Sequence, residues 1–171
     1  MLRKIALSLF LALSLMPFRV PSSSAQELRL PVTGNPAFVL TLPAGWTSLL
    51  DEWGNLRLTH ESRTALIQLS MVTGEDARAS YSDLATGILK EAGAEPYSMN
   101  GQGAIAGVPG QAFLSKITNA NGVTLDLVVT LARLDQDHIA GLVTMKVVGL
   151  SSEAIAAVND VAAKVSFTGM Q

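Results

Sequence analysis

The chain has 171 residues with no cysteine, 12 basic and 14 acidic residues, and a formal net charge of −2. A chain without cysteine cannot be a small disulfide-stapled module, bind a metal through thiolates or use a cysteine nucleophile. Because 49% of the residues are hydrophobic and the basic residues are scattered, we expect a packed globular domain without the basic surface that nucleic acids or anionic lipids require.

The N-terminal segment has the three parts of a secretory signal peptide. Two basic residues near the start precede an apolar run over residues 5–16, and Ser23 and Ala25 are the small residues of a cleavage site. The run is shorter than the roughly 20 residues of a membrane-spanning helix, and no cysteine is present to carry the lipid of a lipoprotein. We predict a signal peptide over residues 1–25 and a periplasmic or secreted protein with no stable membrane insertion after processing.

The mature chain would comprise residues 26–171, a length that fits one domain. Three basic residues lie in the predicted leader, so the mature chain would carry 9 basic and 14 acidic residues and a net charge of −5. A domain of this size can bury roughly 70% of the surface that its unfolded chain exposes. A hydrophobic core can therefore stabilise it without disulfides.

The first part of the mature chain predicts short strands separated by turns. Apolar and polar residues alternate around residues 27–30 and 56–61, and more apolar strands are expected over 38–42 and 65–72. Proline, glycine and asparagine mark the turns between these segments.

A helical period begins at Ser80, since apolar residues then recur at intervals of three and four. Ser80 and Asp83 have the spacing of a capping box, and Gly93 can end the helix. Gly87 lowers helix stability by about 1 kcal/mol relative to alanine. We interpret this glycine as a mark of close packing.

Strands return after this helix. We expect a strand near 96–99 that glycines interrupt, a turn at 107–110, and strands over 111–118, 123–133 and 139–148. The Asn-Gly pair before the second of these long strands is a strong hairpin signal, because it supplies the positive φ angles of a tight turn.

The last predicted element is an amphipathic helix that starts at Ser151 or Ser152. Its expected buried stripe consists of Ile155, Val158, Val161, Ala162 and Val165. The order of strands, helix, strands and helix, with short turns between consecutive strands, favours antiparallel pairing. The fold class that we predict is α+β, with a mainly antiparallel sheet flanked by two helices.

Several short motifs resemble the PsbP-like superfamily. Residues 42–46 resemble its LPxGW motif, residues 65–70 the strand before its first helix, residues 107–110 its G-x-P-G turn, and residues 165–167 its usual ending. The resemblance covers residues 37–168 and is closest to the bacterial exported DcrB-type proteins. It implies an α/β/α sandwich and relatives that bind proteins, serve photosystem assembly or have no assigned role. It supplies no catalytic residue.

One corner of the chain combines aromatic and acidic residues. Trp46 and Trp53 flank Asp51 and Glu52, and such a set could line a groove for a sugar or a peptide. We favour the alternative interpretation, in which Trp46 anchors the core and Trp53 covers a strand end. These four residues are nevertheless the candidate binding site.

The two histidines are the candidates for catalysis or metal binding. Asp135, Asp137 and His138 have the residue types of a small metal site, but aspartates in hairpin turns usually cap backbone amides, and a closed site needs more ligands. His60 lies at a strand end, where a structural role is more common than a catalytic one. No G-x-S-x-G motif or dinucleotide-binding glycine pattern is present.

We therefore expect a non-catalytic exported protein that binds an envelope protein or a small ligand. We expect no cofactor, no metal and no nucleic-acid partner. The alternative is a secreted hydrolase or metal-dependent enzyme that uses His60 or His138 with Asp135 and Asp137.

Overall fold

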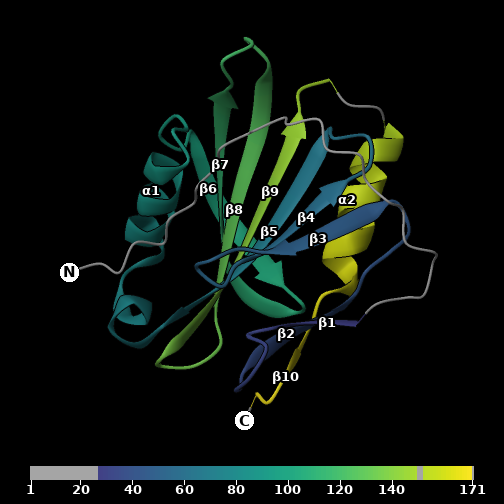
Figure 1. Cartoon of the computed structure of the whole chain (residues 1–171). Coiled ribbons are helices and arrows are strands. Elements are labelled where there is room, and N and C mark those ends of the chain that lie inside the picture. Colours follow the sequence, from purple (N-terminus) through teal and green to yellow (C-terminus); the bar gives the residue numbers. More distant parts are fainter. Residues whose placement is uncertain (1–26, 150–151, 171) are drawn as a thin grey trace.

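The computed structural model describes residues 27–149 and 152–170 (Figure 1). The predicted signal peptide lies outside the described residues. The strands are β1 (Glu27–Leu30), β2 (Ala37–Thr41), β3 (Trp46–Leu50), β4 (Leu56–His60), β5 (Ala65–Thr73), β6 (Met99–Ile105), β7 (Val108–Thr118), β8 (Thr124–Arg133), β9 (His138–Val147) and β10 (Ser166–Thr168). The helices are a short 3-10 helix (Gly74–Arg78), α1 (Tyr81–Glu91) and α2 (Ser152–Lys164).

The strands form two antiparallel sheets. Seven strands make the larger sheet in the order β3-β4-β5-β9-β8-β7-β6, and β1, β2 and β10 make the smaller one with β2 in the middle. The described strand pairs are all antiparallel, as short connections favour. The predicted α+β class with a mainly antiparallel sheet is confirmed.

The two helices cover opposite faces of the larger sheet. On β9, Val143 belongs to the buried cluster that contains Ile88 of α1, whereas its neighbour Leu142 belongs to the cluster that contains Val158 of α2. Successive side chains of a strand point to opposite faces, so α1 and α2 lie on different sides. Figure 1 shows the strands between the two helices. The arrangement confirms the predicted sheet flanked by helices.

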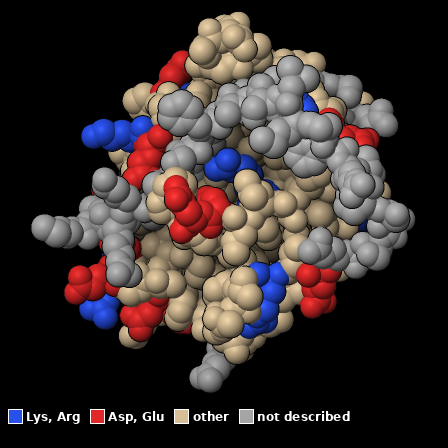
Figure 2. Space-filling view, viewed as in Figure 1, with Lys and Arg blue, Asp and Glu red and all other residues tan. Residues whose placement is uncertain are grey.

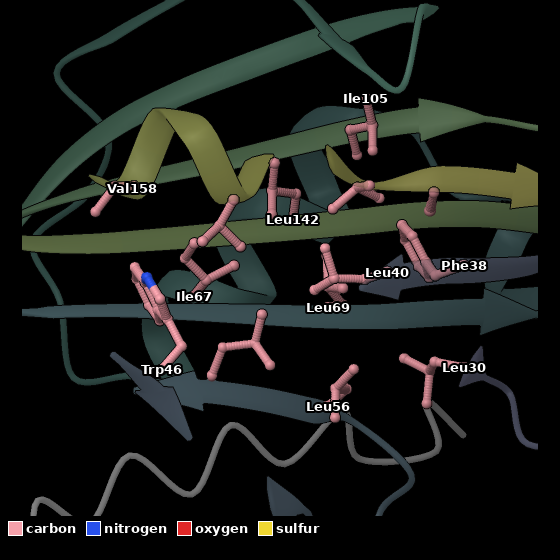
Figure 3. Packing of buried hydrophobic residues seen from close by; sticks show 14 of the residues in the cluster. Leu30, Phe38, Leu40, Trp46, Leu56, Ile67, Leu69, Ile105, Leu142 and Val158 are labelled. Carbon is pink, nitrogen blue, oxygen red and sulfur yellow. The ribbon is translucent and has the colours of Figure 1, made fainter. Parts of the chain in front are cut away.

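The smaller sheet shares the core on the α2 side. Phe38 and Leu40 of β2 are buried with Leu69 of β5 in one cluster (Figure 3). The ring of Phe38 lies 4.9 Å from that of Phe167 in β10, so the two aromatic rings pack together within the smaller sheet. Burial of these large side chains, at about 25 cal/mol per Å² of apolar surface, joins the two sheets into one body.

Helix α1 begins and ends where the sequence predicts. The Ser80 Oγ accepts a hydrogen bond from the backbone N–H of Asp83 at 3.1 Å and donates one to the Asp83 carboxylate at 2.7 Å. Gly93 has φ +69° just past the helix, as an αL stop requires. The inference from Gly87 is wrong, because a Cβ built there would meet no atom within 4 Å.

The predicted turn at residues 107–110 is also wrong. The chain turns at Ala106 and Gly107, with φ +50° and +82°, and β7 begins at Val108. Pro109 and Gly110 belong to this strand. A Cβ at Gly110 would lie 1.9 Å from the carbonyl oxygen of Leu131 in β8, so a glycine is needed here for the close approach of two strands.

Two further expectations have different outcomes. The Asn-Gly hairpin is confirmed, because Gly122 has φ +77° and its N–H donates to the carbonyl of Asn119. In α2, Val158 and Val161 are buried as predicted, but Ile155 is exposed. The apolar stripe of α2 therefore packs on the sheet only beyond its first turn.

Candidate functional site

The structure separates the four residues of the predicted binding corner. Trp46 begins β3, and its side chain is only 7% exposed. Its ring packs edge-to-face on His60 at 5.1 Å and belongs to the α2-side core, where Figure 3 shows it beside Val158. Trp46 therefore anchors the core, as the favoured interpretation proposed.

Asp51 holds the turn that follows β3. One carboxylate oxygen accepts hydrogen bonds from the backbone N–H groups of Trp53 at 3.0 Å and Asn55 at 2.8 Å. The other accepts a bond from the Asn55 side-chain amide at 3.1 Å. These bonds form the Asx-type turn that aspartate stabilises. The carboxylate of Asp51 is thus engaged within its own turn.

Glu52 and Trp53 remain exposed in this turn, and the two leucines of β3 that precede the turn are exposed as well. Trp53 is 42% exposed, Leu49 59% and Leu50 48%. We call Leu49, Leu50, Glu52 and Trp53 the hairpin tip. It brings three large apolar side chains to the surface within five residues at an edge of the larger sheet.

Sequence reasoning found Glu52 and Trp53 but missed the two leucines. Adjacent leucines in a strand point to opposite faces of the sheet. Both are exposed because β3 is the last strand of the sheet. The signal that could have found them is the adjacent pair itself, followed directly by a charged turn.

Gln68 is a buried polar residue that the sequence analysis did not single out. It lies in β5 between Arg57 of β4 and Val143 of β9, and its side chain is 1% exposed. In the part of the chain that the structure describes, neither its Nε2 nor its Oε1 makes a hydrogen bond. An unsatisfied buried polar group costs about 1–3 kcal/mol.

The acidic turn between β8 and β9 contains a carboxylate–histidine pair. Both carboxylate oxygens of Asp135 lie 2.9 Å from the Nδ1 of His138, and one accepts a bond from the Asp137 N–H at 2.8 Å. Partial burial raises the pKa of Asp135, but these bonds and the nearby imidazole outweigh that effect, so its pKa lies below the ordinary value of 3.8. Asp137 faces Arg78 at 3.6 Å.

His60 lies far from this pair. It ends β4 beside the Ala65 end of β5, whereas His138 pairs with Thr73 at the opposite end of β5. The Nδ1 of His60 is 2.7 Å from the Ser62 hydroxyl, within its own turn. Among the described residues, no three His, Cys, Asp or Glu side chains gather closely enough to hold a metal ion.

Two open hollows lie near the C-terminal strand. The larger, about 640 Å³, is lined by Ala104, Ala106, Gly107, Ala162, Ala163, Val165, Ser166, Phe167 and Met170. None of these described lining residues has a titratable side chain. The smaller, about 430 Å³, is lined by Asn35, Pro36, Leu134, Asp135, Gly169 and Met170. Its lining therefore includes Asp135, the carboxylate that bonds His138.

Charged side chains of both signs lie on the surface. Figure 2 shows acidic and basic groups interspersed over one face of the molecule. No helix in the described ranges combines the length and the apolarity that crossing a bilayer requires.

Comparison with known proteins shows similarity of fold. No protein-family model and no curated protein match the chain. A solved structure of LpqN from Mycobacterium tuberculosis, described as involved in cell envelope biogenesis, is 16% identical with a TM-score of 0.52, over 86% of this chain and 93% of LpqN.

A second solved structure is a protein of Bacteroides thetaiotaomicron VPI-5482. It is 16% identical with a TM-score of 0.53, over 77% of this chain and 45% of that protein. The chain therefore spans less than half the length of the Bacteroides protein. At these identities the likeness concerns the fold.

Proposed function

We propose that the chain is an exported, non-catalytic domain that binds another protein in the cell envelope through its hairpin tip. The observation that carries the proposal is the exposure of three large apolar side chains, Leu49, Leu50 and Trp53, within five residues at a sheet edge, with the two leucines on opposite faces of β3. Tryptophan is enriched among the residues that dominate the binding energy of protein interfaces. The description of LpqN as involved in cell envelope biogenesis supports the same cellular setting.

The export part of the proposal rests on the N-terminal sequence. Cleavage after Ala25 would give a mature N-terminus at Gln26, close to the start of β1 at Glu27. The intact mass of the protein from the periplasmic or secreted fraction tests this. Full-length chain embedded in the membrane would contradict it.

We also infer membership of the PsbP-like superfamily, close to the DcrB-type proteins. The segment 42–46 supports this inference, because it forms the turn into β3, with Gly45 at φ +80° and Trp46 buried at the edge of the core. Helices on both faces of an antiparallel sheet agree with the sandwich that the resemblance implies.

Co-purification tests the hairpin tip. Trp53→Ser should remove a specific envelope partner that the wild-type protein retains, because it deletes the large exposed ring of the tip. Val123→Ser is the matched control, since Val123 is another exposed apolar residue beside a hairpin turn, at a different place in the fold. Equal retention of the partner by both variants would contradict the proposed surface.

The enzymatic alternative has one observation in its favour. Asp135, which bonds His138, lines the 430 Å³ hollow, and a carboxylate–imidazole pair can activate water as a general base. Among the described residues that line this hollow, none is a serine or a threonine that could act as a nucleophile. If the protein hydrolyses a generic ester substrate and His138→Gln abolishes the activity, this alternative replaces the proposal.

A further inference from the structure

We propose that two copies of this chain associate through β3, pairing antiparallel about a two-fold axis at Ser48. The inference rests on the proposed function in that both use the same hairpin as the interaction surface, and here a second copy of the chain occupies it. Its evidence is the hydrogen-bond pattern of β3, its side chains and its position at the end of the sheet.

The backbone groups on the outer side of β3 can be assigned from its pairing with β4. The N–H of Asp51 donates to the carbonyl of Asn55 at 2.9 Å, and the N–H of Glu61 donates to Gly45 at 2.8 Å. Hydrogen-bonded pairs alternate along an antiparallel ladder. Odd-numbered residues therefore bond to β4, and Trp46, Ser48 and Leu50 direct their N–H and C=O groups away from the sheet.

These outward groups are self-complementary. When a second β3 lies antiparallel with Ser48 opposite its own copy, Trp46 of one chain lies opposite Leu50 of the other. The three resulting pairs are all of the hydrogen-bonded type, in which two residues exchange both bonds. A shift of the register by one residue would place residues that bond to β4 opposite residues whose backbone groups point away from the sheet. These hydrogen bonds would then be lost.

The side chains of β3 favour the same register. The strand contains no charged residue and no proline, so it lacks the usual protections of an edge strand, and the pairing sets no like charges opposite each other. The exposed side chain of Leu50 would gain the indole of Trp46 as a cross-strand neighbour, and Leu49 would lie beside Thr47.

The other edge of the sheet is a weaker candidate. Strand β6 is also uncharged, but it contains Gly101 and Gly103, and Met99 is its one large exposed apolar side chain. Glycine weakens strand pairing because it has no side chain to pack. The structure thus favours β3 over β6.

Cysteine cross-linking tests the register, because the chain has no other cysteine. The protein is purified in the form that the cells produce and oxidised with copper phenanthroline. Ser48→Cys should give disulfide-linked dimers, since residues of a hydrogen-bonded pair have Cα atoms about 5.5 Å apart, within disulfide range. Thr47→Cys and Met99→Cys should give little, because in this register neither residue lies opposite its own copy.

Sedimentation of the uncross-linked protein tests the association itself. Leu49→Lys should weaken the dimer at least tenfold, because it places a charge beside the pairing strand of each copy. Met99→Lys is the matched control on the other edge strand and should leave the dimer constant unchanged. A wild-type protein that stays monomeric at about 100 μM, well above an ordinary micromolar dissociation constant, would overturn the inference.

A dimer that responds to Met99→Lys and not to Leu49→Lys would also overturn it. The proposed function fails separately. If the wild-type protein is monomeric but Trp53→Ser still loses its envelope partner, the dimer is refuted and the partner surface stands. If the protein dimerises through β3 but Trp53→Ser retains the envelope partner, the dimer stands and the partner surface is refuted.

Discussion

The two tryptophans illustrate how position decides the role of one residue type. Trp46 packs on His60 and belongs to the buried cluster that contains Val158, whereas Trp53 is exposed in a turn. Trp46→Ala should lower the free energy of unfolding by about 3–5 kcal/mol, the range for deleting a large core aromatic. Trp53→Ala should change it by less than about 1 kcal/mol. Urea denaturation of both variants measures this, and similar losses would contradict the core assignment.

The buried side-chain amide of Gln68 should lower the free energy of unfolding. Both polar atoms of its buried amide lack hydrogen bonds within the described residues, so a methionine of similar shape would remove that cost. Gln68→Met should raise the free energy of unfolding by about 1–3 kcal/mol. Gln68→Ala controls for the loss of packing and should be destabilising. If the methionine variant were less stable than wild type in urea denaturation, the amide must be satisfied in solution.

Asp135 should make stability depend on acid pH. Its pKa in the folded protein lies below the ordinary value of 3.8, because hydrogen bonds from Asp137 and His138 outweigh partial burial. A lowered folded-state pKa stabilises the protein above the unfolded-state pKa, and this stability is lost as pH falls through the folded value.

As the pH falls from about 5 to about 2, the range in which such a carboxyl titrates, the free energy of unfolding should therefore decrease less for Asp135→Asn than for the wild-type protein. Denaturation curves at several pH values test this. Parallel losses in the two proteins would show that the pair with His138 does not form.

Sequence predicted the core role of Trp46 but not the exposure of Leu49 and Leu50. A tryptophan directly after a Pro-x-Gly turn is a local signal for the start of a strand. The exposure of the leucines depends on β3 being the last strand, which no local pattern records. The lack of partners at Gln68 likewise depends on what lies beside it in the folded sheet.

At the scale of single elements, α1 offers a direct test of helix propensity. Gly87 lies inside the helix, and a Cβ there would meet open space. Gly87→Ala should raise the free energy of unfolding by about 0.8–1 kcal/mol, because alanine is the better helix former and nothing must move to admit its methyl group. Thermal and urea denaturation measure the gain. A loss of stability would mean that this glycine permits a contact or function in solution.

Elements with local signals were predictable, and those defined by tertiary contacts were not. The cap at Ser80 and the Asn-Gly turn are set by neighbours in sequence, and both are confirmed. Pro109 and Gly110 have the composition of a turn but lie in β7, because the close approach of Leu131 on β8 requires a glycine there. That requirement comes from a residue 21 positions away.

At the scale of the whole molecule, the class of the fold was predictable and the sheet order was not. Periodicity predicted strands, two helices and antiparallel pairing. The smaller sheet joins β1 and β2 to β10 at the other end of the chain, and Arg29 bonds Thr168 across this junction at 2.8 Å. Such pairing depends on three-dimensional packing. The order of the larger sheet places β3 last among its described strands, and the hairpin tip lies at this edge.

Site-specific photo-crosslinking in intact cells tests the central claim that the hairpin tip binds a protein. A photoreactive residue at Glu52, exposed within the tip, should give a discrete adduct with another protein or with a second copy, which mass spectrometry identifies. The same probe at Asn121, exposed in the β7–β8 turn, should give none. An adduct at position 121 but not at position 52, or no adduct at either, would contradict the account.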